Sequence, residues 1–169
     1  AGGDICKKEL EDKKKNKVAF YNEYGPTETT VTSIEYKDFG ENEFNISLPI
    51  GKPLSNIRIH IVNSENEICP VGIAGELCIS GDCLARGYLN KPEITAEKFV
   101  KDPFSNEPNA RMYRTGDIGR WMTDGNIEYL GRIDEQVKIR GYRIELGEIE
   151  SVINEFEQVS NSSVAAIPD

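Results

Sequence analysis

The sequence predicts an α+β fold that is mostly β, with a small antiparallel barrel-like subdomain followed by a short α+β segment. Two observations predict it. Short runs of alternating polar and apolar residues, separated by turn residues, fill the region from about 46 to 131. Beyond residue 145, apolar residues recur at helical spacing instead. A change from a period of two to a period of 3.6 marks the change from strands to a helix.

The first residues are less regular. Gly2 and Gly3 favour a strand-to-helix turn, and Asp4 is a candidate cap for a short helix after it. Residues 18–22 are mostly apolar and predict a strand. A β-branched cluster at 27–33 indicates that another element begins there.

Alternation predicts the strands of the barrel. Residues 37–45 are polar and loop-like, whereas 56–62 alternate over the length of a strand. Residues 63–66 predict a turn, and a second strand is expected at 75–81. The side chains expected on one face of the first strand are Ile57, Ile59 and Ile61.

A helix is expected after Asn90, which is a candidate N-cap, because Pro92 suits a first turn. Ile94 and Phe99 are its expected inward side, and Pro103 its expected end.

A strand at 112–115 and a hairpin around Asp124-Gly125-Asn126, joining Trp121 to 127–130, complete the barrel.

Residues 137–142 predict a strand in which Val137, Ile139 and Tyr142 face one side and Lys138 and Arg140 the other. A helix and a final apolar strand are expected after it. The helix has one apolar stripe, formed by Leu146, Ile149, Val152, Ile153 and Phe156.

The expected division is 1–133 and 134–169, with Asp134 as a hinge between them. The stripe of the helix needs a partner surface, since burying five side chains contributes at most about 15 kcal/mol before chain entropy is subtracted. We therefore expect 134–169 to be the least stable part.

Composition excludes several classes. The net charge of −9 argues against a general nucleic-acid or anionic-membrane binder, and no apolar run approaches the roughly twenty residues that span a bilayer. With no signal peptide visible, a cytoplasmic location is expected.

The four cysteines form no Cys-x-x-Cys pair and His60 is the single histidine, so no zinc site is expected. Cys78, within a strand-like run, is expected to be a buried reduced thiol.

A candidate nucleotide site lies at Tyr24-Gly25-Pro26-Thr27-Glu28. An aromatic ring can stack on a purine, a Gly-Pro turn exposes backbone, and a hydroxyl and a carboxylate suit a phosphate and a divalent cation. Taken alone, the same five residues favour a surface turn with a capped element after it.

Three segments together resemble the amino-acid adenylation domain of nonribosomal peptide synthetases, in the superfamily of adenylate-forming enzymes. They are Asn22-Glu23-Tyr24-Gly25-Pro26-Thr27-Glu28, Tyr113-Arg114-Thr115-Gly116-Asp117 and the run from Gly131 to Glu145, which contains Gln-Val-Lys-Ile-Arg-Gly-Tyr-Arg-Ile-Glu. They occur in the family's order and span nearly the whole chain.

The resemblance implies roles for the first two segments. Asn22 lies at the adenine edge, Tyr24 stacks on the adenine beside the Gly25 turn, Thr27 contacts the α-phosphate, and Glu28 coordinates Mg²⁺. Asp117 accepts hydrogen bonds from the ribose hydroxyls; its alternative is an ordinary turn aspartate.

In the third segment, the resemblance implies that Arg132 reaches the ribose and phosphate region and that Asp134 is the pivot of the second lobe. Lys138 and Gly141 would enter the site after the lobe rotates. Tyr129 would help to line the site. Tyr129 could equally be an ordinary aromatic residue of a hairpin, and Lys138 could equally be a solvated lysine of a strand.

The implied amino-acid pocket includes Gly2, Glu23, Val31 and Thr32, and these do not name the amino acid. Catalysis in the family also needs a Gly/Ser/Thr-rich phosphate loop and a lysine from the end of the second lobe, neither of which this sequence contains. The chain begins without methionine and is expected to be a fragment, inactive by itself.

The implied activity is that of an antibiotic-biosynthesis ligase, which forms aminoacyl-AMP from ATP and Mg²⁺ and loads it onto the phosphopantetheine thiol of a peptidyl carrier protein. Alternatives are a D-alanine–carrier-protein ligase, an acyl- or aryl-CoA ligase, and a non-catalytic β-barrel interaction module.

Overall fold

The computed structural model describes residues 19–38, 48–134, 137–139 and 142–167. The chain divides into two compact units, Ala1–Gly131 and Arg132–Asp169. The predicted division after residue 133 stays a prediction. The turn and helix expected from Gly2 to Asp4, most of the loop expected at 37–45, and the expected site residues Gly2 and Gly141 lie outside the described residues.

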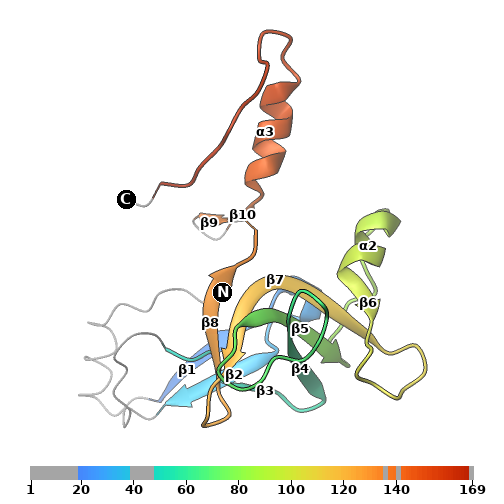
Figure 1. Cartoon of the computed structure of the whole chain (residues 1–169), viewed down its shortest axis with the longest axis vertical. Helices are drawn as coiled ribbons and strands as arrows, with labels where there is room; N and C mark the ends of the chain where they lie inside the picture. Colours follow the sequence, from blue (N-terminus) through green and yellow to red (C-terminus); the bar gives the residue numbers. More distant parts are fainter. Residues whose placement is uncertain (1–18, 39–47, 135–136, 140–141, 168–169) are drawn as a thin grey trace. The chain divides into compact units, whose positions relative to one another are not determined.

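The first unit begins with a small antiparallel sheet of β1 (Phe20–Tyr24), β2 (Ile34–Asp38) and β3 (Lys52–Pro53), in that order (Figure 1). The strand predicted at 18–22 therefore exists but begins and ends two residues later. Its partner β2 continues to Asp38, two residues into the expected loop. The element expected in the β-branched cluster before β2 is a single 3₁₀ turn, η1 (Thr27–Thr29), followed by a bend.

The larger sheet contains β4 (Ile57–Val62), β5 (Gly75–Gly81), β6 (Phe99–Lys101), β7 (Arg111–Trp121) and β8 (Ile127–Arg132). Its order is β4-β5-β7-β6, and β8 also pairs with β7. The pairs from β4 to β7 are antiparallel and the sheet curls into a half-barrel (Figure 1). The predicted α+β, mostly β fold is thus confirmed, as are the strands expected at 56–62 and 75–81.

The two faces of the curled sheet bury different side chains, as alternation requires. Ile59 and Ile61 lie in the main core and Ile57 packs against it, so the predicted face of β4 is correct. On the other face, Cys78 packs with Val62 and Met112. Cys78 is fully buried and free, as predicted, and burial raises the pKa of its thiol to about 12.

Truncating the main core should destabilise this unit strongly. Leu77 is fully buried in the core cluster, so Leu77→Ala is expected to lower the free energy of unfolding by about 2–5 kcal/mol. Denaturant unfolding of the chain measures this. Val71→Ala is the control, because Val71 is 60% exposed and its truncation should change stability by less than about 0.5 kcal/mol. Equal effects of the two substitutions would contradict the assignment of the core.

The small sheet joins the large one at an isolated antiparallel bridge between Gly51 and Ile127. Ile127 donates its backbone N–H to the Gly51 carbonyl at 2.8 Å and accepts the Ile50 N–H at 2.9 Å. Gly51 has a positive φ of 101°, and a Cβ there would lie 2.0 Å from the carbonyl oxygen of Glu35. Only glycine fits this close approach. The bridge connects the first residue of β8 to the residue before β3.

The helix α2 (Pro92–Lys98) differs from the expectation in three ways. Lys91 is its N-cap and Asn90 adopts a positive φ of 55°, so Asn90 turns the chain before the helix instead of capping it. Ile94 is 45% exposed. The helix ends before Phe99, which is buried but starts β6, so Pro103 has no part in ending it.

The hairpin predicted around residues 124–126 is confirmed, with Met122 and Asn126 hydrogen bonded across the turn. The strand expected at 112–115 is longer than predicted. It continues through Gly116 and Asp117 to Trp121, because the residues before and after Gly116 and Asp117 pair with β5.

In the second unit, β9 (Val137–Ile139) and β10 (Tyr142–Ile144) form an antiparallel hairpin, so the single strand expected at 137–142 is wrong. Two short strands satisfy each other's backbone groups, which one isolated strand cannot do. The helix α3 (Leu146–Asn154) follows, as predicted. The final apolar strand is not found among the described residues, since 161–167 are irregular. No helix in the described part of the chain has the length and apolar character needed to cross a membrane.

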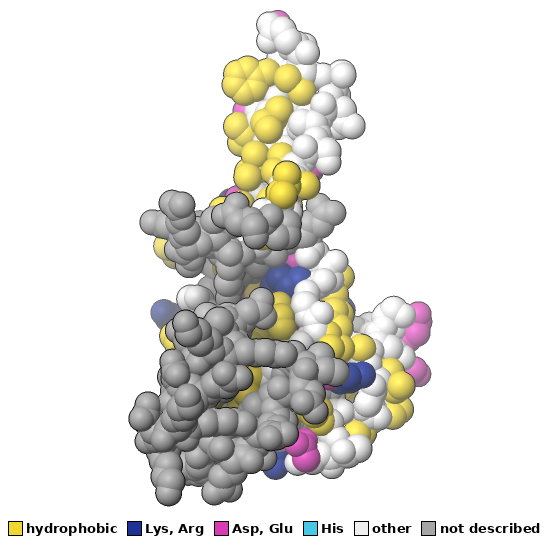
Figure 2. All heavy atoms as spheres, turned by 90° about the vertical axis from the view of Figure 1, so that its left-hand side faces the viewer, with side chains coloured by type: hydrophobic (Ala, Val, Ile, Leu, Met, Phe, Trp, Pro, Cys, Tyr) yellow, Lys and Arg dark blue, Asp and Glu magenta, His cyan; other side chains and the backbone are white. Residues whose placement is uncertain are grey.

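The apolar stripe of the second unit is largely uncovered. Figure 2 shows hydrophobic side chains gathered along one side of the α3 segment, and Ile149, Val152 and Phe156 are 40%, 58% and 61% exposed. Leu146 is the residue of α3 that is buried. The expected need of this helix for a partner surface fits this exposure.

We therefore expect amide hydrogens of α3 to exchange faster than those of β5, where six of seven residues are buried. Hydrogen–deuterium exchange with mass spectrometry on the 169-residue chain measures both segments in one sample. Protection of α3 equal to that of β5 would contradict the prediction that this segment is the least stable.

Candidate functional site

The tyrosine and the aspartate of the two predicted nucleotide segments are in direct contact. Tyr24, at the end of β1, donates a hydrogen bond from its hydroxyl to a carboxylate oxygen of Asp117 on β7, 93 residues away. The ring of Tyr129 on β8 lies beside that of Tyr24, with 6.1 Å between ring centroids. The fold thus gathers three predicted residues from three strands.

Tyr24 and Asp117 are both buried, at 5% and 7% exposure. Burial, followed by the neighbouring Asp117 carboxylate, raises the pKa of the Tyr24 hydroxyl well above its usual value. The hydroxyl is therefore a neutral donor at every physiological pH. The ring also packs in the main core, and its stacking on adenine stays a prediction.

The segment after Tyr24 folds back sharply. Ser33 donates its backbone N–H to the Tyr24 carbonyl oxygen at 2.8 Å, and a Cβ on Gly25 would lie 2.5 Å from the Val31 carbonyl oxygen. The hydroxyls of Thr29 and Ser33 share a buried hydrogen bond of 2.7 Å. This packing explains the glycine at position 25.

Two consecutive non-glycine residues in this turn have left-handed backbones. Thr30 has φ 61° and Val31 has φ 70°. β-branched residues are uncommon in the left-handed region. Holding one there costs of order 1–3 kcal/mol of conformational free energy. Val31 is also 72% exposed. Strain of this kind concentrates at functional sites, and it coincides here with a predicted pocket position.

Glu28, the predicted metal ligand, lies within η1 and is 7% exposed. Its Oε1 accepts a 2.7 Å hydrogen bond from the Tyr88 hydroxyl, which lies 3.3 Å from the Tyr113 hydroxyl. Thr27, at the start of η1, is exposed. A carboxylate beside the Tyr88 hydroxyl supplies hard oxygen donors of the kind that Mg²⁺ prefers.

The contact between Glu28 and Tyr88 escaped the sequence analysis. Two more hydrogen bonds hold the loop that contains Tyr88. The Thr30 hydroxyl donates to the Cys83 carbonyl at 2.8 Å, and the Ala85 N–H donates to the Glu28 carbonyl at 2.9 Å. These contacts join residues more than fifty positions apart. No periodicity or spacing signals them.

Two predicted pocket residues are neighbours. The Thr32 hydroxyl donates to Glu23 Oε2 at 3.4 Å, and Glu23 is exposed. Asn22 instead donates its side-chain amide to the Pro49 carbonyl at 2.8 Å. Glu23 on β1 is thus in contact with Thr32 in the turn that follows, and Val31 precedes Thr32 in that turn.

The remaining predicted residues belong to the second unit. The Arg132 guanidinium donates from Nε and Nη2 to the two oxygens of Asp134, at 2.5 and 2.7 Å. This bidentate pair gives the expected hinge aspartate a local cationic partner. Lys138 lies in the centre of β9. Contacts of Arg132 with nucleotide and hinge motion at Asp134 stay predictions.

Comparison with known proteins identifies a family to which the chain is similar. The family described as AMP-binding enzyme matches residues 1–89. Among curated proteins, bacitracin synthase 3 of Bacillus licheniformis is 53% identical over 172 residues, covering 99% of this chain and 3% of that protein. The chain therefore spans a small part of the length of such relatives.

Solved structures show the same fold. PA1221, described as an NRPS protein containing adenylation and PCP domains, is 33% identical with a TM-score of 0.70, over 79% of this chain and 27% of that one. IdnL1 has a TM-score of 0.88 and 27% identity, over 99% of this chain and 35% of that one.

Proposed function

Because the chain belongs to the AMP-binding enzyme family, we propose that it is the part of an amino-acid adenylation domain that holds the nucleoside of ATP. The reaction proposed for the whole domain is aminoacyl-AMP formation for nonribosomal peptide synthesis. The bacterial synthase relatives, the predicted motifs and the PA1221 description support this proposal.

One observation carries it furthest. Tyr24 comes from the predicted adenine segment and Asp117 from the predicted ribose segment, and they share a buried hydrogen bond. Adenine and ribose are joined by one bond, so the residues that recognise them must lie together. A non-catalytic docking barrel has no need for a buried carboxylate at this place.

In the proposed first step, an amino-acid carboxylate oxygen attacks the α-phosphorus of ATP and the bond to pyrophosphate breaks. Asp117 orients the ribose through its hydroxyls, and Thr27 contacts the α-phosphate. Glu28 would hold Mg²⁺, which when bound offsets phosphate charge. Glu23, Val31 and Thr32 would face the amino acid.

In the proposed second step, the thiol of a carrier-protein phosphopantetheine attacks the activated carbonyl, and AMP leaves. The second lobe would turn about Asp134 between the two steps and bring Lys138 toward the site. Arg132, paired with Asp134, would contact the ribose and phosphate region.

The test is amino-acid-dependent exchange of radioactive pyrophosphate into ATP by the complete adenylation domain, with each proteinogenic amino acid, D-alanine and a panel of aryl acids. Stimulation by one or a few L-amino acids supports the proposal. Stimulation by D-alanine alone, or formation of CoA thioesters from aryl acids, would instead establish one of the neighbouring ligases. The 169-residue chain alone should exchange slowly or not at all, since its sequence lacks the phosphate loop and the lysine.

A further inference from the structure

The strand that presents Asp117 contains an irregularity beside it. Between the pair Cys78–Arg114 and the pair Glu76–Ile118, β5 advances by two residues while β7 advances by four. The two extra residues of β7 are taken up in a bulge around Gly116, whose φ is 72°. Such bulges redirect side chains next to functional sites.

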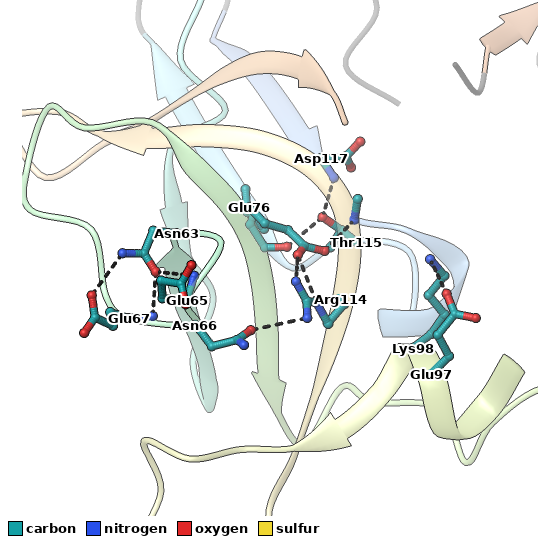
Figure 3. Close-up of polar contacts among 12 residues, drawn as sticks. Asn63, Glu65, Asn66, Glu67, Glu76, Glu97, Lys98, Arg114, Thr115 and Asp117 are labelled. Carbon is teal, nitrogen blue, oxygen red and sulfur yellow. Dashed lines mark hydrogen bonds and ion pairs between the residues drawn. The ribbon is translucent and has the colours of Figure 1, made fainter. Parts of the chain in front are cut away.

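A buried carboxylate holds this bulge from β5. Glu76 is 8% exposed, and its Oε1 accepts the backbone N–H of Gly116 at 3.1 Å. Its Oε2 accepts Arg114 Nε at 2.9 Å and also Arg114 Nη2. Figure 3 shows Glu76 beside Arg114, whose Nη1 donates in turn to Asn66 Oδ1 at 3.3 Å.

Thr115 completes the bulge. Its hydroxyl donates to the Leu77 carbonyl at 2.6 Å and accepts the backbone N–H of Asp117 at 2.9 Å (Figure 3). The backbone on both sides of Gly116 is therefore bonded to fixed groups. Glu76 supplies the charged contact to the Gly116 N–H, and such contacts are stronger than neutral ones.

We propose that Glu76 is a positioning residue, which fixes the bulge at Gly116 and so holds the Asp117 carboxylate where the two ribose hydroxyls of ATP meet it. The proposal rests on the proposed function. Glu76 acts through Gly116 and Arg114 and touches no substrate. If the bulge loosens, hydrogen bonding to the ribose weakens before the rest of the site changes.

The test uses Glu76→Gln in the complete adenylation domain, which keeps the shape of the side chain and removes its charge. We expect kcat/KM for ATP to fall about 10-fold, mainly through KM, and kcat/KM for 2′-deoxyATP to fall about 2-fold. The preference for ATP over 2′-deoxyATP then narrows about 5-fold. A general loss of folded enzyme would lower both values equally and leave the ratio unchanged.

Glu128→Gln is the matched control. Glu128 on β8 forms a comparable ion pair with another arginine of β7, Arg120 Nε, at 2.7 Å, away from the bulge. Its substitution should leave the nucleotide ratio at the wild-type value. Asp117→Asn gives the reference for complete loss of the ribose contact.

An unchanged ratio in folded Glu76→Gln overturns the proposal while leaving the proposed function intact, provided that the wild type exchanges pyrophosphate and Asp117→Asn narrows the ratio. Absence of exchange by the wild type overturns both. If Glu76→Gln does not fold, Arg114→Gln replaces it, because it removes the cation that orients Glu76. An unchanged ratio in that variant overturns the proposal equally.

Discussion

Asp117→Asn in the complete adenylation domain is expected to lower kcat/KM for ATP by about 10²- to 10³-fold, chiefly by raising KM. Hydrogen bonds to a charged partner contribute roughly 1.5–3 kcal/mol each, and every 1.4 kcal/mol corresponds to a factor of ten. Asparagine keeps an acceptor for the Tyr24 hydroxyl, so the folded structure should be preserved. Steady-state pyrophosphate exchange over a range of ATP concentrations gives the two constants.

Asp117→Ala separates binding from stability. It removes the same ribose contact and also leaves the Tyr24 hydroxyl buried without this acceptor, at a cost of about 1–3 kcal/mol in unfolding free energy. Asp124→Asn, in the exposed turn of the same hairpin, is the control and should leave kcat/KM unchanged. A wild-type KM in Asp117→Asn would refute the ribose assignment.

Glu28→Gln should produce a loss of similar size by a different route. The amide still accepts from the Tyr88 hydroxyl but lacks the charge that binds a hard cation. We expect exchange at saturating ATP to fall about 10²- to 10³-fold, within the range found when one electrostatic contact to a transition state is lost. The concentration of Mg²⁺ needed for half-maximal rate should rise.

A titration of exchange rate against free Mg²⁺ measures both effects. Glu97→Gln serves as control, because Glu97 is an exposed residue of α2 that pairs with Lys98 at 3.2 Å. An unchanged Mg²⁺ dependence in Glu28→Gln would remove Glu28 from the proposed metal site, whatever happens to the rate.

Local patterns predicted the parts of the fold that depend on neighbours in sequence. Alternation located β4 and β5, and the Asp124-Gly125-Asn126 turn located the hairpin of β7 and β8. Where tertiary contacts decide, the patterns were wrong. Asn90 has the chemistry of a cap but adopts a left-handed turn. The sequence of residues 137–142 alternates as one strand would, yet 137–139 and 142–144 form two paired strands.

The same limit applies to the site. The resemblance of two motifs to those of a known family selected Tyr24 and Asp117 as residues for one nucleotide, and the fold places them in contact. The contacts of Glu28 with Tyr88 and of Glu76 with Gly116 join residues 60 and 40 positions apart. The first depends on how a loop packs against η1, and the second on the register of β5 and β7, and no local pattern encodes either.

The left-handed backbone at Val31 also affects how this region could be redesigned. Glycine or asparagine at that position would relieve the strain, whereas most other side chains would inherit it. If Val31 borders the amino-acid pocket, as proposed, then a library of substitutions made to change the activated amino acid would vary thermal stability at the same time. Selection for activity in such a library would also select for variants that remain folded. A stabilised parent protein is therefore the better starting point for the library.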